Sequence, residues 1–168
     1  MSLGVVALDI AIVLAVIAFF NKNLRTQMRL LVSRFGLLGI FLFSTFAIIG
    51  TLYFQYFVHL NPCVLCWWQR VFMYPIPMLS FIALLKGKRL DDIADYVIAL
   101  AFFGGAFSLY QHFLQILPAG SLIPCDATND CATRLVFEFG FVTIPWMGVT
   151  TFAALALIAL IGRMKSAK

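Results

Sequence analysis

Long apolar runs alternate with short polar or basic segments along this chain. Five runs stand out, at residues 3–20, 35–58, 67–85, 93–117 and 144–162. Each has close to the roughly 20 apolar residues that an α-helix needs to cross a bilayer. The pattern therefore predicts an all-α integral membrane protein, a four-helix transmembrane bundle with an additional hydrophobic helix at its N-terminus.

The composition agrees with a membrane protein and excludes a soluble globular fold. Hydrophobic residues make up 63% of the 168 residues and charged residues only 11%, whereas charged residues form about a quarter of a soluble domain. The formal net charge is +5, but the basic residues flank the apolar runs instead of forming one patch, so nucleic acid is not an expected partner. The expected surroundings are a lipid bilayer.

The positions of the basic residues predict the orientation. Ten of the twelve lie in the segments 22–34, 86–89 and 163–168, and basic loops stay on the cytoplasmic side of a membrane. The loops at about 59–66 and 118–143 are then extracytoplasmic. All four cysteines of the chain lie in these two loops.

Two units are predicted: residues 1–34, a membrane anchor helix with a basic cytoplasmic linker, and residues 35–168, the four-helix membrane domain. The run at 3–20 contains one charged residue, Asp9, and it lacks the basic start and small-residue cleavage site of a signal peptide. We expect this run to span the membrane, with an interfacial helix as the alternative. Asp9 either faces the other helices or lies near the outer surface.

Several residues inside the runs bear on packing. Pro75 and Pro77 predict a kink and not a break, because neighbouring helices can satisfy the freed carbonyl groups. Gln55 is expected to pack or to form a hydrogen bond at the interface. Small residues in the second run predict close approach of neighbouring helices. They are Gly36, Gly39, Ser44, Thr45 and Gly50.

The four cysteines are Cys63, Cys66, Cys125 and Cys131, and outside the cytoplasm disulfides can form. Three connectivities are possible; the spacings favour Cys63–Cys66 and Cys125–Cys131, because close pairs close small rings at low entropic cost. A C-x-x-C bridge constrains little chain and adds little stability, which favours a redox role for the first pair. The second pair is either a loop staple or a redox pair.

The residues around the first pair favour reactivity. Pro62 is typical of a helix start, so Cys63 and Cys66 are expected in the first turn, where free N–H groups and the helix dipole stabilise a thiolate. Arg70 follows Cys66 by one helical turn, and its charge would stabilise an anion on the same face. The alternative for Arg70 is an interfacial residue that reaches the phosphate headgroups.

A zinc site is the other chemical interpretation, since four converging thiolates hold zinc tetrahedrally. Five residues separate Cys125 from Cys131, whereas about two to four are usual between paired zinc ligands. Oxidation outside the cytoplasm also competes with metal binding. We therefore expect no metal.

Several motifs together resemble one family. They are N-P-C-V-L-C-W-W-Q-R at 61–70, Tyr110-Gln111-His112, Pro124-Cys125 and G-F-V-T-I-P-W at 140–146. In this combination, from about residue 35 to residue 162, the chain resembles the DsbB family of membrane thiol oxidases. C-V-L-C with the following arginine is specific for that family, and the short cysteine loop is similar to its BdbC-like branch.

The resemblance implies disulfide bond formation at the bacterial cytoplasmic membrane. The implied catalytic residues are Cys63, Cys66, Cys125 and Cys131, and the implied quinone-binding residues are Arg70 and His112. A reduced DsbA-like protein of thioredoxin fold would attack Cys125, and Cys131 would pass the electrons to Cys63. Cys66 would then contact a membrane quinone, either ubiquinone or menaquinone. Each dithiol transfer is thiolate attack on a disulfide through a mixed intermediate.

Two features depart from the family pattern. Many members have a longer loop between the second pair of cysteines, with a helix on the membrane surface that is not expected here, and the helix at 3–20 is additional to the usual four. The vitamin K epoxide reductase family fits less well, because its loop cysteines precede the C-x-x-C helix. The remaining rival is a non-catalytic membrane scaffold or transporter subunit with disulfide-stapled outer loops.

Overall fold

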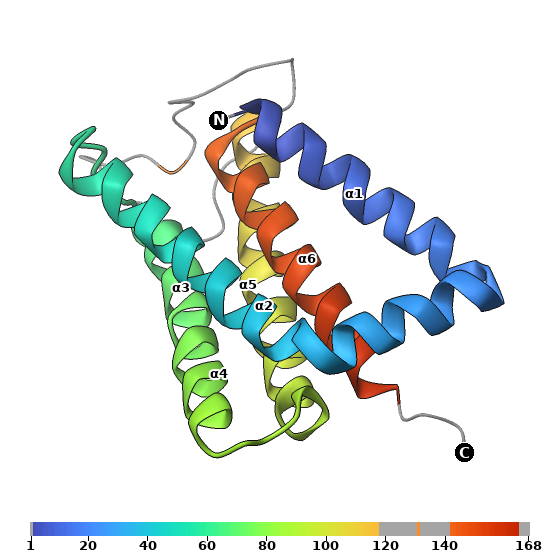
Figure 1. Ribbon diagram of the computed structural model, residues 1–168. Coiled ribbons are helices and arrows are strands. Elements are labelled where there is room, and N and C mark those ends of the chain that lie inside the picture. Colours follow the sequence, from blue (N-terminus) through green and yellow to red (C-terminus); the bar gives the residue numbers. More distant parts are fainter. Residues whose placement is uncertain (1, 118–130, 132–141, 165–168) are drawn as a thin grey trace.

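The structure, a computed structural model, describes residues 2–117, 131 and 142–164 (Figure 1). Six helices lie within these ranges. They are α1 (Ser2–Phe20), α2 (Lys22–Tyr56), α3 (Val64–Met73), α4 (Pro75–Leu85), α5 (Leu90–Ile116) and α6 (Ile144–Arg163). The prediction of an all-α membrane fold is confirmed.

Five helical segments are long and apolar enough to cross a membrane: α1, α2, α5, α6 and the combined α3–α4 segment Val64–Leu85. Tyr74 alone separates α3 from α4, and its N–H donates to the Arg70 carbonyl at 2.9 Å. α4 resumes at Pro75, where a proline at the first helical position has no N–H to leave unpaired. The prolines thus interrupt the helix without ending the span.

The second helix is longer than predicted. It begins at Lys22, so the basic segment that we expected as a linker is helical, and the Asn21 side chain caps it by accepting from the Asn23 N–H at 3.1 Å. Arginine, lysine, leucine and methionine in this segment all favour helix. Its 35 residues extend about 52 Å, well beyond the roughly 30 Å of a hydrocarbon core. Figure 1 shows the first half of α2 bending away from the bundle to meet α1.

Two hydrogen bonds tie α1 and the first half of α2 to opposite ends of α6. Near the start of α6, Trp146 Nε1 donates to Asp9 Oδ2 at 3.1 Å. At its end, Arg29 Nη2 donates to the Met164 carbonyl at 2.8 Å, a contact that suits the negative end of the helix dipole. Asp9 therefore faces another helix, one of the two alternatives that the sequence left open.

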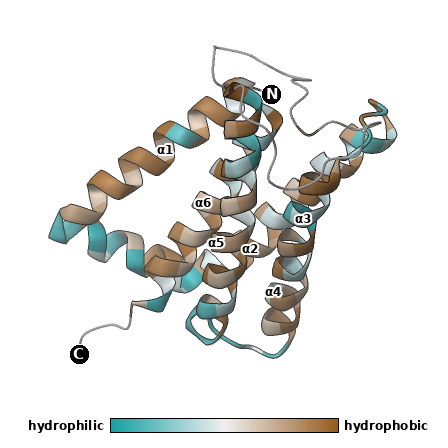
Figure 2. Ribbon diagram, turned by 180° about the vertical axis from the view of Figure 1, so that it is seen from behind, coloured by the Kyte–Doolittle hydropathy of each residue, from teal (hydrophilic) through white to brown (hydrophobic). Residues whose placement is uncertain are grey.

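The apolar core lies where α2, α4, α5 and α6 meet, since α6 packs against α5 and α2, and α4 packs against the same two helices. Its buried residues are Leu37, Ile40, Met73, Ile76, Ala83, Leu90, Ala94, Val97, Ala101, Phe152, Leu155 and Ala159. Many other large apolar side chains are exposed. Figure 2 shows hydrophobic residues along the helices and hydrophilic residues gathered at their ends, the distribution that lipid-facing helices require.

The small residues of α2 do not all act as predicted. A Cβ atom at Gly36 would lie 2.8 Å from Leu90 Cδ2, so this glycine does permit close packing. Cβ atoms at Gly39 and Gly50 would meet no heavy atom within 4 Å. Those two glycines therefore leave open space instead of admitting a neighbouring helix.

Cys63 and Cys66 lie at the opposite end of the bundle from the basic turn between α4 and α5. The end of α2, the start of α3, the end of α5 and the start of α6 lie at one end of the bundle, and the α4–α5 turn lies at the other (Figure 1). That turn carries Lys86, Lys88 and Arg89. Cys63 and Cys66 are thus remote from it, as the predicted orientation requires; the side of the membrane that each end faces stays a prediction.

Gly104 on α5 permits tight packing of α5 against α6. A Cβ atom at Gly104 would lie 2.3 Å from Phe152 Cζ, whereas one at Gly105 would lie 3.5 Å from Phe152 Cβ, an ordinary contact. We predict that Gly104→Ala lowers the free energy of unfolding by about 1–3 kcal/mol, the usual cost of overpacking, because Phe152 is buried in the core. Gly105→Ala adds the same methyl group to the same helix and is the matched control. Thermal unfolding in detergent, followed by circular dichroism, measures both, and equal midpoints would contradict the prediction.

Candidate active site

Cys63 and Cys66 lie at the start of α3. Cys66 lies in the first turn of α3, as the position of Pro62 predicted, whereas Cys63 is the N-cap residue, with extended backbone angles (φ −74°, ψ 174°), and lies just before that turn. Their sulfur atoms are 3.2 Å apart, a contact in which one thiol hydrogen-bonds to the other. The two sulfurs are therefore adjacent, and the disulfide form of this pair stays a prediction.

An amide from α5 reaches both sulfurs. Gln111 Nε2 lies 3.2 Å from Cys63 Sγ and 3.5 Å from Cys66 Sγ. Gln69 Nε2 donates to Gln111 Oε1 at 2.6 Å, which directs the NH₂ end of the Gln111 amide towards the sulfurs. Both glutamines lie in motifs that carry the family resemblance, but the sequence analysis assigned neither of them a role at the sulfurs. One signal was the position of Gln69, three residues after Cys66 and so on the same helix face; the other was the place of Gln111 in the Tyr110-Gln111-His112 motif, next to the histidine that was assigned a role.

The two thiols differ in how readily they lose a proton. The pKa of Cys63 is raised, first by its hydrogen bond with Cys66 and then by burial. Cys63 therefore keeps its proton when the reduced pair loses one, and the negative charge resides on Cys66. Around Cys66 Sγ, the Gln111 amide and the N–H groups of the first turn of α3 can stabilise that charge.

Cys131 lies beside this pair, although it is far away in the sequence. It is 1% exposed and belongs to the same buried cluster as Cys63, Leu65 and Leu114, and hydrogen bonding with Cys131 contributes to the raised pKa of Cys63. Cys125 lies outside the described residues, so its pairing stays a prediction. Among the residues that the structure does describe, no group of three or more His, Cys, Asp or Glu side chains could hold a metal ion.

Arg70 is buried, with 8% of its surface exposed. Its guanidinium donates to Gln55 Oε1 and, at 3.3 Å, to the Thr51 carbonyl, both on α2. Its Cζ atom also lies 5.1 Å from the centre of the Trp67 ring, a cation–π distance. Arg70 is thus held inside the protein instead of reaching for headgroups, and Gln55 is the polar partner that holds it.

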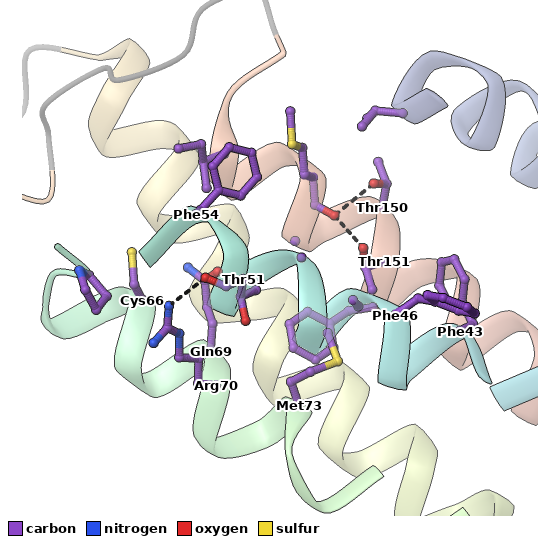
Figure 3. Close-up of a pocket in the computed structure, with 18 of the residues that line it drawn as sticks. Phe43, Phe46, Thr51, Phe54, Cys66, Gln69, Arg70, Met73, Thr150 and Thr151 are labelled. Carbon is purple, nitrogen blue, oxygen red and sulfur yellow. Dashed lines mark hydrogen bonds between the residues drawn. The ribbon is translucent and has the colours of Figure 1, made fainter. Parts of the chain in front are cut away.

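Cys66 and Arg70 share one cavity of about 410 Å³, lined by residues of α1, α2, α3, α6 and the turn before α3. Figure 3 shows Cys66, Gln69 and Arg70 towards one end of it, and Phe43 and Phe46 towards the other. The cavity therefore has a polar end with a thiol and a cation, and an apolar remainder. A volume of several hundred Å³ is typical of small-molecule sites.

His112 does not join this cavity. Its Nδ1 atom lies 2.8 Å from Thr143 Oγ1, and its ring centre lies 4.9 Å from that of Trp146. The structure thus places Arg70 and Cys66 in the same cavity, whereas His112 is not among the described residues that line it. The role of His112 in quinone binding stays a prediction.

Comparison with known proteins identifies the family. A family model described as disulfide bond formation protein DsbB matches residues 33–162. The chain is 39% identical over 129 residues to the SPbeta prophage-derived disulfide bond formation protein B of Bacillus subtilis, covering 77% of this chain and 86% of that protein. It is 35% identical over 126 residues to a probable disulfide formation protein C of Halalkalibacterium halodurans, covering 74% of this chain and 90% of that one. No solved structure matches the chain significantly.

The matched region includes every cysteine of the chain and the buried arginine beside Cys66. It begins inside α2 and leaves out α1. The chain has two adjacent thiols at the start of α3 and five helices able to span a membrane, and it matches the DsbB family model over most of its length. The chain therefore belongs to the DsbB family of disulfide bond formation proteins and is a bacterial membrane thiol oxidase.

Proposed function

We propose that this thiol oxidase takes electrons from a reduced DsbA-like protein of thioredoxin fold and passes them to a membrane quinone. The electrons travel through Cys125 and Cys131 and then through Cys63 and Cys66, on the extracytoplasmic side of the membrane. The observation that carries the proposal is the cavity in which Cys66 and Arg70 share one end and apolar side chains line the rest.

The residues of this cavity fit a quinone. A quinone has a ring with two carbonyl oxygens and an apolar tail, so it needs a hydrogen-bond donor at one end and apolar walls beyond. Arg70 has five N–H donors and can donate to a ring oxygen while it keeps its contacts with Gln55 and Thr51. When bound, a quinone accepts two electrons and two protons and leaves as the hydroquinone.

The thiol steps balance without any further reagent. A thiolate of the partner attacks Cys125 of a Cys125–Cys131 disulfide, and the partner's second thiol resolves the mixed disulfide, which leaves the partner oxidised and both loop cysteines reduced. Cys131 then attacks Cys63 of a Cys63–Cys66 disulfide, and Cys66 leaves with the electron pair. Attack by Cys125 on the Cys131–Cys63 bond restores the loop disulfide. The burial of Cys131 against Cys63 supports this order.

Gln111 positions the first pair for these steps. When Cys66 leaves as an anion, the Gln111 NH₂ group is within hydrogen-bonding distance of it, and hydrogen bonds to charged groups are worth about 1.5–3 kcal/mol. Gln69 holds that amide in place from α3. The rival interpretation, a stapled scaffold, gives no reason for a buried guanidinium to share a cavity with Cys66 or for a buried amide to reach both sulfurs.

The proposal predicts quinone reduction that depends on both cysteine pairs. Purified protein, mixed with excess reduced DsbA-like partner and either ubiquinone or menaquinone, should reduce one of them, as followed by absorbance. Cys66→Ala and Cys125→Ala should each abolish turnover, because each breaks the only dithiol path. Circular dichroism checks that both variants fold. No turnover with either quinone, from folded protein with intact disulfides, would favour the scaffold.

Arg70→Ala should weaken the apparent affinity for quinone more than it slows partner oxidation at saturating quinone. Loss of a charge-assisted hydrogen bond of about 1.5–3 kcal/mol corresponds to a rise of roughly 10- to 100-fold in the KM for quinone. Arg163→Ala, which removes an exposed arginine paired with Asp95, is the matched control. Arg70→Lys tests whether charge without the guanidinium fork suffices. Equal losses in both measurements, or none, would remove Arg70 from the quinone site.

Gln111→Leu should slow alkylation of the reduced Cys63–Cys66 pair by roughly tenfold in mildly acidic buffer, where the thiolate is the minor form, because the thiolate loses a hydrogen bond of about 1.5 kcal/mol. The rate of iodoacetamide labelling, resolved by peptide mass spectrometry, measures this. Gln115→Leu is the control, since the Gln115 amide donates to the Cys131 carbonyl, at 3.4 Å, and to no sulfur of the pair. Similar labelling rates in the two variants would show that Gln111 does not act on the sulfurs.

A further inference from the structure

The N-terminal helix α1 borders the cavity that holds Cys66 and Arg70. Gly4, Val5 and Leu8 of α1 are among its lining residues, although the family match begins only at residue 33. The cavity wall on this side therefore comes from a helix that the matched family region does not contain. The proposed thiol chemistry uses residues of α3, α5 and the loop that carries Cys125 and Cys131, so it does not explain the function of α1.

The position of α1 against the cavity is fixed by a specific polar contact. Asp9 is the one charged residue in the apolar run 3–20, and its Oδ2 atom accepts from Trp146 Nε1 at 3.1 Å. A carboxylate in a membrane helix is costly unless it has a partner, so this contact favours the docked position of α1. Trp146 lies in the first turn of α6, close to Met147 and Gly148, which also line the cavity.

Two glycines leave room in the cavity walls. A Cβ atom at Gly4 of α1 or at Gly50 of α2 would meet no heavy atom within 4 Å, and both glycines line the cavity. Phe43 and Phe46 of α2 and Leu8 of α1 complete an apolar surface around this space. The part of the cavity next to α1 is therefore open and lined by hydrocarbon.

The polar atoms nearest this region are already paired. The hydroxyl groups of Thr150 and Thr151 donate to the Met147 carbonyl at 3.0 Å and 2.7 Å (Figure 3). Each hydroxyl has thus used its one donor, whereas Arg70 at the other end has five N–H donors, more than its bonds to Gln55 and Thr51 use. The chemistry of the cavity thus changes from polar beside Cys66 to apolar beside α1, which matches an acceptor with a polar ring and an apolar chain.

We propose that α1 forms one wall of a subsite for the polyprenyl tail of the acceptor, between α1, α2 and α6. The inference rests on the proposed function, because it takes a quinone ring at Cys66 as its starting point. A tail is favoured over an unrelated lipid chain because the open region and the Cys66–Arg70 end belong to one continuous cavity. Short-tailed acceptors do not reach α1, so α1 makes the enzyme selective for tail length.

The test compares a long-tailed quinone with a tailless analogue that carries the same ring. Gly4→Leu places a side chain in the open space that the tail would occupy. The KM for the long-tailed quinone should therefore rise roughly tenfold relative to that for the analogue, a loss of about 1.4 kcal/mol of binding free energy. Ala7→Leu is the matched control, because Ala7 is an exposed small residue of the same helix that does not line the cavity. Its KM ratio should equal that of the wild type.

A second pair of variants tests the contact that holds α1. Asp9→Leu removes the acceptor for Trp146 Nε1 and should raise the same KM ratio, because α1 is no longer fixed against the cavity. Asp9→Asn keeps a carbonyl oxygen at this position and should restore a ratio near that of the wild type. Rescue by asparagine separates the hydrogen bond from a general effect of the Asp9 charge.

The outcomes separate this inference from the proposed function. If the wild type reduces both quinones and Gly4→Leu and Asp9→Leu leave the KM ratio unchanged, α1 is not a wall of the tail site, whereas quinone reduction stands. A ratio raised equally by Ala7→Leu would also overturn the inference, since it would reflect α1 as a whole. If the wild type reduces neither quinone, the proposed function fails and the tail subsite fails with it.

Discussion

A guanidinium buried among apolar helices is the constraint on which the site depends. A charged side chain at membrane depth is costly unless it is paired, and Arg70 meets this requirement with Gln55, the Thr51 carbonyl and the Trp67 ring. The contacts with Gln55 and Thr51 join α3 to α2. Since both helices line the cavity, the residues that stabilise the arginine also form the walls of the space in which it acts.

A second polar cluster joins α3 to α5 at the sulfurs. Gln69 donates to Gln111, and Gln111 lies within hydrogen-bonding distance of both sulfurs, so the buried Gln111 amide is satisfied and does not destabilise the fold. The two sulfurs lie 3.2 Å apart. Cys131 packs against the outer side of this cluster. The first pair therefore lies between the loop cysteine and the cavity, the position that an electron relay needs.

The thiol chemistry and the proposed selectivity for tail length depend on different parts of the chain. Residues within the family match hold the sulfurs and the cation, whereas α1, outside that match, contributes apolar wall and a single polar contact. An added helix can thus alter the shape of a lipid-side cavity while the buried hydrogen bonds of the thiol site stay as they are. The bend of α2 makes this possible, because it brings α1 back against α6 (Figure 1).

The sequence by itself determined the membrane helices, a disturbance of the helix at the prolines and the position of Cys63 and Cys66 at a helix start, because hydropathy and proline act within a few residues of the chain. It also marked Arg70, one turn from Cys66. Tertiary structure alone decided that Gln111, 48 residues from Cys63, reaches the sulfurs and that α1 borders the cavity. Such contacts depend on how helices pack against each other, and local periodicity carries no record of that.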